Sequence, residues 1–65
     1  MVVKLIELLG TSSKSWENAV ELAVNKAGES IKNIHAVDVL GFTAKIENGK
    51  ISEYRANVKI AFVVE

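Results

Sequence analysis

The feature that most constrains the fold of this chain is the regular alternation in its last third. Apolar side chains occupy every even position from Tyr54 to Val64, while the odd positions from Glu53 to Lys59 are polar or charged. A period of two residues is typical of a β-strand with one buried face and one polar face. The sequence therefore predicts an amphipathic strand over residues 53–64.

Two further elements are predicted in the first half of the chain. Residues 2–9 have the length and the Val, Ile and Leu content of a strand, which Gly10 would end. An apolar stripe with spacings of three and four residues predicts an amphipathic helix. This helix follows an N-cap at Ser12, carries Glu17 in its first turn and ends near Asn33. The stripe consists of Trp16, Val20, Ala23, Ala27, Ile31 and Ile34. Its two alanines indicate a sheet packed closely against the helix.

The segment after the helix predicts another strand, but its alternation breaks in the middle. Apolar residues occupy odd positions at Val37 and Val39 and even positions from Leu40 to Ile46. One extra residue near positions 38–40, a β-bulge, would return both groups to the same buried face. The opposite, polar face then holds Ala36, Asp38, Gly41, Thr43 and, from the last strand, Arg55.

The segment ENGK, residues 47–50, predicts a hairpin between the last two strands. A two-residue Asn-Gly turn is the usual form. Here it would place even positions opposite odd ones and separate the two apolar sets. A three-residue loop, 47–49, with Gly49 in a left-handed conformation, pairs even positions with even ones. The sequence therefore favours the longer loop, in a register that sets Arg55 opposite Gly41.

Together these elements predict an α+β fold in which residues 1–65 form one β-α-β-β domain. A single helix packs on one side of a three-stranded antiparallel sheet, and the other side meets water, a ligand or another subunit. So short a chain buries only about 60% of the surface that it exposes when unfolded. With no cysteine and 49% hydrophobic residues, a homo-oligomer is expected.

The composition argues against several classes of function. Eight basic residues balance eight acidic ones without a basic stripe, so nucleic acid is not an expected partner. The absence of cysteine and the single histidine leave no thiolate or histidine-rich metal site, and no metal ligand is assigned. The first ten residues are too short and too charged for a signal peptide or a membrane span. A cytoplasmic location and no membrane partner are therefore expected.

Enzymatic activity is not expected either. The serines cluster at the predicted helix start whereas His35 follows the helix end, and no phosphate-binding glycine pattern is present. Trp16 is interpreted as a packing residue in the core or at an interface. Arg55 has two open interpretations: an ion pair with Asp38 or Glu53, or a contact to a ligand.

Four segments of the sequence resemble the dodecin family: LLGTSSKSWENAV, NIHAVDV, AKIENGK and EYRANVKIAFVV. The resemblance covers essentially the whole chain. It implies a hollow, roughly spherical dodecamer of β-α-β-β subunits. It also implies that flavins (riboflavin, FMN or lumichrome) bind as stacked pairs between two-fold-related sheets, for storage and without turnover.

The resemblance also implies where a ligand would bind. In flavin-binding members a tryptophan sandwiches the ring system and a glutamine bonds its edge, and these positions are Ala36 and Arg55 in this sequence. The expected ligand-binding residues are therefore Ala36, Asp38, Gly41 and Arg55. Some relatives bind calcium, so the alternative is a structural or calcium-binding shell, with oxygen ligands from Asp38, Glu47 or Glu53 across a symmetry axis.

Overall fold

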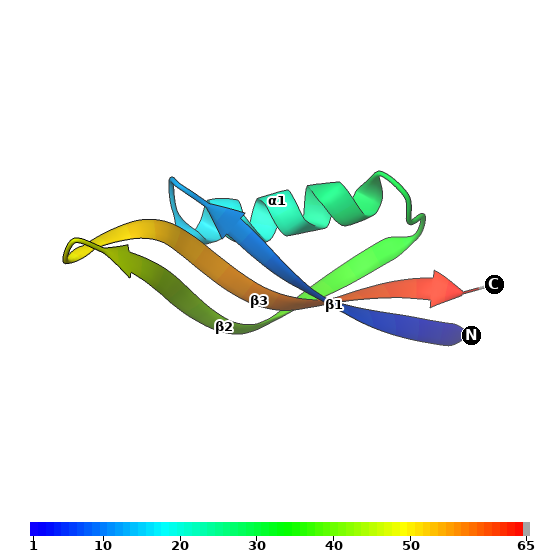
Figure 1. Ribbon diagram of the computed structural model, residues 1–65. Coiled ribbons are helices and arrows are strands. Elements are labelled where there is room, and N and C mark those ends of the chain that lie inside the picture. The colour runs from blue at the N-terminus through cyan, green and yellow to red at the C-terminus, as the bar shows by residue number, and fades with distance from the viewer. Residues whose placement is uncertain (65) are drawn as a thin grey trace.

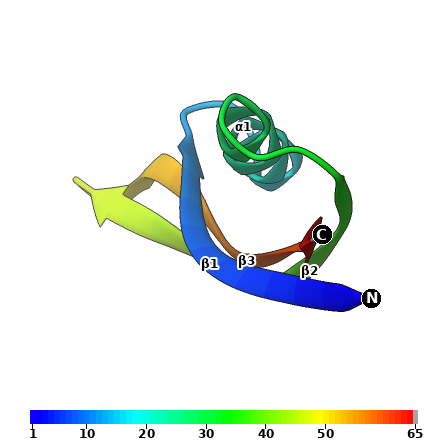
Figure 2. The same ribbon diagram turned by 90° about the vertical axis from the view of Figure 1, so that its right-hand side faces the viewer.

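The computed structural model describes residues 1–64, and these form one helix and three strands in the order β1-α1-β2-β3. Their bounds are β1 Val2–Ser12, α1 Trp16–Gly28, β2 Ile34–Glu47 and β3 Lys50–Val64. Strand β3 lies in the centre of the sheet, between β1 and β2, and is antiparallel to both. The helix crosses one side of the strongly twisted sheet (Figure 1; Figure 2). The predicted β-α-β-β fold is confirmed.

The core lies between α1 and β3 and is built from small side chains. Its buried residues are Ala19, Ala23 and Ala27 from the helix, and Ala56, Val58 and Ile60 from the strand. Two of the helical alanines belong to the predicted stripe, whereas Ala19 was not foreseen. Methyl groups let the helix axis approach the sheet closely, so that the core is thin.

Gly10 is where the helix and the sheet approach most tightly. A side chain at this position would overlap the backbone carbonyl of Ala19 and would crowd the methyl group of Ala23. The prediction that Gly10 ends the first strand is wrong, since β1 continues to Ser12 and Gly10 is buried within it. Close contact with the helix requires a glycine at this position. The residues next to Gly10 in the sequence do not reveal this contact.

The helix starts and ends at other residues than those predicted. Ser15, not Ser12, is the N-cap, and its hydroxyl accepts a hydrogen bond from the Asn18 amide at 3.0 Å. Glu17 lies in the first turn as expected. The helix stops at Gly28, five residues before Asn33, and the last two apolar residues of the stripe contact the core from outside the helix. Ile31 does so from the connection and Ile34 from β2.

The predicted β-bulge in β2 is confirmed, with the register shifting between Val39 and Gly41. On either side of this shift, Val37, Val39 and Phe42 pair with Ile60, Val58 and Ala56, the buried residues of β3. Both apolar groups of β2 therefore lie on the helix side of the sheet. A second irregularity, which the sequence analysis missed, lies between Ile34 and Ala36.

The prediction of a three-residue hairpin loop is wrong. Glu47 pairs with Lys50, and the turn consists of Asn48 and Gly49, both with positive φ (52° and 76°). Even positions nevertheless pair with even ones, because the register shifts again between Lys45 and Ile46, where β3 carries the extra residue. The alternation of apolar residues is the same for a three-residue loop as for a two-residue loop followed by a bulge. The sequence pattern alone therefore could not distinguish the two.

Replacing Gly10 with alanine is expected to lower the free energy of unfolding by about 1–3 kcal/mol, because the new methyl group forces the helix off the sheet. Urea unfolding at a fixed protein concentration would measure this. Gly28→Ala is the matched control: its position has open space and lies at the helix end, so its effect should be neutral or slightly stabilising. Equal stability of both variants would contradict the proposed close contact.

Candidate functional site

The sheet side that faces away from α1 is the candidate site, and we call it the outer face. Directly paired residues on neighbouring strands lie on the same side of a sheet. The odd-numbered residues of β3 from Arg55 to Ala61 alternate with its buried positions and so point outward. Each of these residues has one partner on β1 and one on β2, so that four rows cross the sheet in the order β1, β3, β2. The rows are Thr11–Arg55–Thr43, Leu9–Asn57–Gly41, Glu7–Lys59–Asp38 and Leu5–Ala61–Ala36.

All four residues expected at a ligand site lie on this outer face. Ala36 pairs with Ala61, Asp38 with Lys59, and Gly41 with Asn57, one row away from Arg55. The predicted register is wrong in one detail, since Arg55 lies opposite Thr43 and not opposite Gly41. The two-residue offset has two causes of one residue each: the turn is one residue shorter than predicted, and β3 carries one extra residue near the hairpin.

The four residues share a face but do not converge on one point. Ala36 pairs with Ala61, six positions along β3 from Arg55, so these two side chains are separated by about 20 Å at a rise of about 3.3 Å per residue. A single subunit thus offers a long, open surface and not a closed pocket. A ligand held here must be elongated or shared between two copies of the chain.

The chemical character of the outer face changes along its length. The row of Leu5, Ala61 and Ala36 is apolar, and the next row alternates acidic, basic and acidic side chains. The row at the opposite end combines two hydroxyls with a guanidinium. This surface can contact an apolar ring at one end and form hydrogen bonds at the other.

Arg55 forms the ion pair that the sequence analysis named as one interpretation. Its Nε donates to Oε2 of Glu53 at 2.7 Å, and the two side chains are 37% and 34% exposed. The alternative partner, Asp38, lies two rows further along the sheet. The pair is too exposed to contribute much stability, but it fixes the direction of the guanidinium.

Trp16 lies on the helix side of the sheet, as its place in the apolar stripe predicted. Its indole Nε1 donates to the backbone carbonyl of Thr43 at 2.8 Å. The ring meets Tyr54 and Phe42 edge to face, with centroid distances of 4.8 and 6.2 Å. With Ser15, Glu17 and Phe42 it borders an open hollow of about 530 Å³. The packing interpretation is confirmed, and the hydrogen bond joins the start of α1 to an edge strand.

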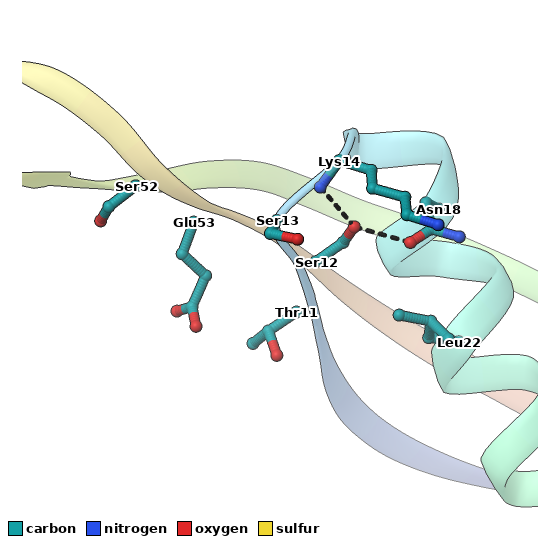
Figure 3. A pocket seen from close by; sticks show the side chains of 8 residues that line it. All are labelled: Thr11, Ser12, Ser13, Lys14, Asn18, Leu22, Ser52 and Glu53. Carbon is teal, nitrogen blue, oxygen red and sulfur yellow. Dashed lines mark hydrogen bonds between the residues drawn. The ribbon is translucent and has the colours of Figure 1, made fainter.

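A second hollow, rich in hydroxyl groups, lies where β1 passes into α1 (Figure 3). Its volume is about 380 Å³, and its lining is Thr11, Ser12, Ser13, Lys14, Asn18, Leu22, Ser52 and Glu53. The Ser12 hydroxyl donates to Oδ1 of Asn18 at 2.7 Å and accepts from the Lys14 amide at 2.9 Å. Through these bonds, Ser12 stabilises the connection between β1 and α1. It does not cap the helix, as the sequence had predicted.

Neither hollow has the ligands of a preformed metal site. Within residues 1–64, no three His, Cys, Asp or Glu side chains lie close enough together to hold a metal ion. The same part of the chain contains no helix that is both long and apolar enough to cross a membrane.

Large apolar side chains are exposed on both sides of the sheet. Leu5 and Leu9 on the outer face and Phe42 on the helix side are between 56% and 58% exposed, and Ile46 near the hairpin is 59% exposed. On the outer face, the charged row Glu7–Lys59–Asp38 separates Leu5 from Leu9. These exposed side chains favour association with another chain, because association would remove apolar surface from water.

The structure thus consists of a small β-α-β-β unit with one sheet face that the helix does not cover (Figure 2). The family profile of the dodecins matches residues 2–65, and this chain belongs to the dodecin family. It is 36% identical over 62 residues to the calcium dodecin of Mycobacterium tuberculosis, a match that covers 94% of this chain and 86% of that protein. It is 27% identical over 64 residues to the dodecin of Thermus thermophilus, covering 98% and 93% of the two chains.

Solved structures show the same fold. Dodecin from Streptomyces coelicolor superposes with a TM-score of 0.95 at 25% identity, covering 98% of this chain and 91% of that one. The calcium-chelating antigen calcium dodecin from M. tuberculosis, described as having a novel calcium-binding site, superposes with a TM-score of 0.89 at 29% identity. That match covers all of this chain and 93% of the other.

Replacing Trp16 with phenylalanine should lower the free energy of unfolding by about 0.5–1.5 kcal/mol, because the Thr43 carbonyl loses its donor. Thermal unfolding followed by circular dichroism would measure this without relying on the single tryptophan. The control is Tyr54→Phe, which keeps the ring against Trp16 and should change stability by less than about 0.5 kcal/mol. A Trp16→Phe variant as stable as the parent protein would show that the hydrogen bond contributes nothing.

Proposed function

We propose that this chain assembles into a hollow homododecamer that binds and sequesters small aromatic ligands of the flavin class. The ligand is riboflavin, FMN or lumichrome, and it is stored in the cytoplasm without being transformed. The observation that carries the proposal is the bulge between Val39 and Gly41, which brings Ala36, Asp38 and Gly41 to the same face as Arg55. These are the ligand-binding residues of the proposed site.

The shape of the outer face suits a planar ring system. Ala36 and Ala61 pair with each other and have short side chains, so their row leaves space in which a ring can lie against the sheet. Leu5 lies in the same row, on β1. Burying an apolar ring against such a surface is favourable by about 25 cal/mol for each Å² removed from water.

A second copy of the chain supplies the other wall. One subunit covers a ligand from one side only, whereas a two-fold-related sheet encloses it and also covers the exposed leucines. Polar groups in the next two rows, Asp38 and Asn57, are placed to bond a ring edge. Sequestration therefore depends on assembly, since the outer face formed by the paired strands of residues 2–64 is open on one side.

Holding a ligand is favoured over transforming it because the outer face lacks the groups of an acid–base site. Catalysis needs titratable side chains that converge on one reacting atom. The charged residues of the outer face instead form a row across the sheet, Glu7–Lys59–Asp38, open to the neighbouring surface. We therefore propose a binding protein and not an enzyme.

A calcium-binding shell is the second candidate, and its support is the 36% identity to the calcium dodecin of M. tuberculosis. Calcium takes about six to eight oxygen ligands. One subunit brings too few together, but Glu7 and Asp38 lie in the same row, and symmetry-related copies would multiply their carboxylates. Such a site would form only in the assembly.

Flavin binding is tested by titrating riboflavin and FMN with micromolar assembled protein and following flavin fluorescence. We expect retention of the flavin and quenching of its emission. Ala36→Trp should tighten binding by about 2- to 12-fold, since aromatic stacking contributes about 0.5–1.5 kcal/mol beyond buried area. Lys32→Trp, in the exposed connection before β2, is the control and should leave the affinity unchanged.

The same experiments distinguish the two candidates. Purified protein that is yellow, or that releases a fluorescent chromophore on heating, supports flavin storage. Colourless protein that leaves both flavins free, and whose melting temperature rises on adding calcium, supports the calcium-binding shell.

A further inference from the structure

The tip of the β2–β3 hairpin has a chemistry of its own, because its turn is an asparagine followed by a glycine. Asn48 and Gly49 both have positive φ, 52° and 76°, as a two-residue hairpin turn requires. Every residue from Lys45 to Ser52 is exposed, and the hairpin extends past the start of α1 (Figure 1). The turn therefore lies outside the buried core.

The backbone nitrogen of Gly49 is an available nucleophile for the side chain of Asn48. The nitrogen that follows an asparagine can attack the carboxamide carbon Cγ once it has lost its proton to hydroxide. Within residues 1–64 no hydrogen bond engages this nitrogen. In the same part of the chain, no atom beyond its chain neighbours lies within 4 Å of the place where a Cβ at position 49 would stand. Attack at this turn is therefore unobstructed.

Asn33 shows that the glycine, and not the backbone conformation alone, distinguishes the hairpin turn. Asn33 is also exposed and has a φ of 63°. Its successor is Ile34, whose β-branched side chain packs against the core and crowds its own backbone nitrogen. The Asn33 carbonyl also accepts a hydrogen bond from the Val63 amide at 3.2 Å, which restrains the backbone. Asn33 thus combines the same conformation with a hindered neighbour.

From this contrast we propose that Asn48 is a site of spontaneous deamidation and isomerisation in the folded protein. The Gly49 nitrogen forms a bond to Cγ of Asn48, the Cγ–Nδ2 bond breaks, and ammonia leaves with the proton of the backbone amide. Water then opens the resulting succinimide ring. Cleavage at Cγ gives aspartate, and cleavage at the backbone carbonyl carbon gives isoaspartate. No oxidant or reductant is needed, because the net change replaces an NH2 group by an OH group.

The products change both the charge and the geometry of the hairpin. Eight basic and eight acidic residues give the chain a formal net charge of 0, and one added carboxylate makes it −1. This carboxylate follows Glu47 directly in the sequence. Isoaspartate also routes the main chain through its own Cβ and so lengthens a turn that is closed by the pair of Glu47 and Lys50. The hairpin end of the sheet therefore exists in an original form and an aged form.

Storage of the folded, assembled protein in mildly alkaline buffer tests the proposal. Peptides prepared at acidic pH, where the reaction is slow, are mapped by mass spectrometry. Isoaspartate is measured independently by methylation with a protein isoaspartyl methyltransferase. We expect Asn48 to react at least about tenfold faster than Asn33, which corresponds to a barrier lower by about 1.4 kcal/mol. The rate should rise with pH, because the attacking nitrogen must lose its proton.

Asn48→Gln is the matched variant, since a glutamine would have to close a larger and slower-forming ring. It should abolish the acidic form that appears on ion exchange during storage, together with the methylation signal. Asn33→Gln should leave both unchanged. The inference is overturned if Asn48 in the folded protein stays intact or reacts no faster than Asn33. Persistence of the acidic form in Asn48→Gln, or a reaction seen only after unfolding, would overturn it as well.

Discussion

The arrangement of this subunit depends on one extra residue in β2, between Val39 and Gly41. Because side chains alternate across a strand, a register shift of one residue exchanges its two faces. Without the bulge, β2 could not place both Val37 and Phe42 on the helix side of the sheet. With the bulge, Val37, Val39 and Phe42 lie on the helix side, and Ala36, Asp38 and Gly41 lie on the opposite side, in line with Arg55.

The same geometry favours the proposed assembly of so small a chain. The helix is lined by Ala19, Ala23 and Ala27 and lies close to β3, so that the shared core is thin. A single helix covers one side of a three-stranded sheet (Figure 2), and large apolar side chains remain exposed elsewhere. Covering them with other copies stabilises the fold and encloses the outer face in a single step. In the proposed assembly, stability and ligand binding therefore have a common physical origin.

The sequence predicted the faces of the elements well and their exact ends poorly. Alternation and helical spacing are properties of neighbouring residues, so the strands, the helix and the bulge could be recognised. Ser12 and Ser15 are chemically alike as caps, and only the path of the chain decides between them. Gly10 is required by its contact with Ala19 and Ala23 of α1, and alternation along the strand does not reveal that contact. The shift in β3 after the hairpin, which sets Arg55 opposite Thr43, leaves the same parity as a longer loop and could not be distinguished from it.

The central claim is that the outer face is enclosed by a second copy of the chain. The most direct measurement is the labelling rate of a single cysteine at Asn57, in the centre of this face, in a chain that otherwise has no cysteine. A bulky polyethylene glycol maleimide should react slowly with the assembled Asn57→Cys protein and rapidly after dissociation. Glu29→Cys, at the exposed end of the helix, should react rapidly in both states. Rapid labelling at position 57 in the intact assembly would contradict the account.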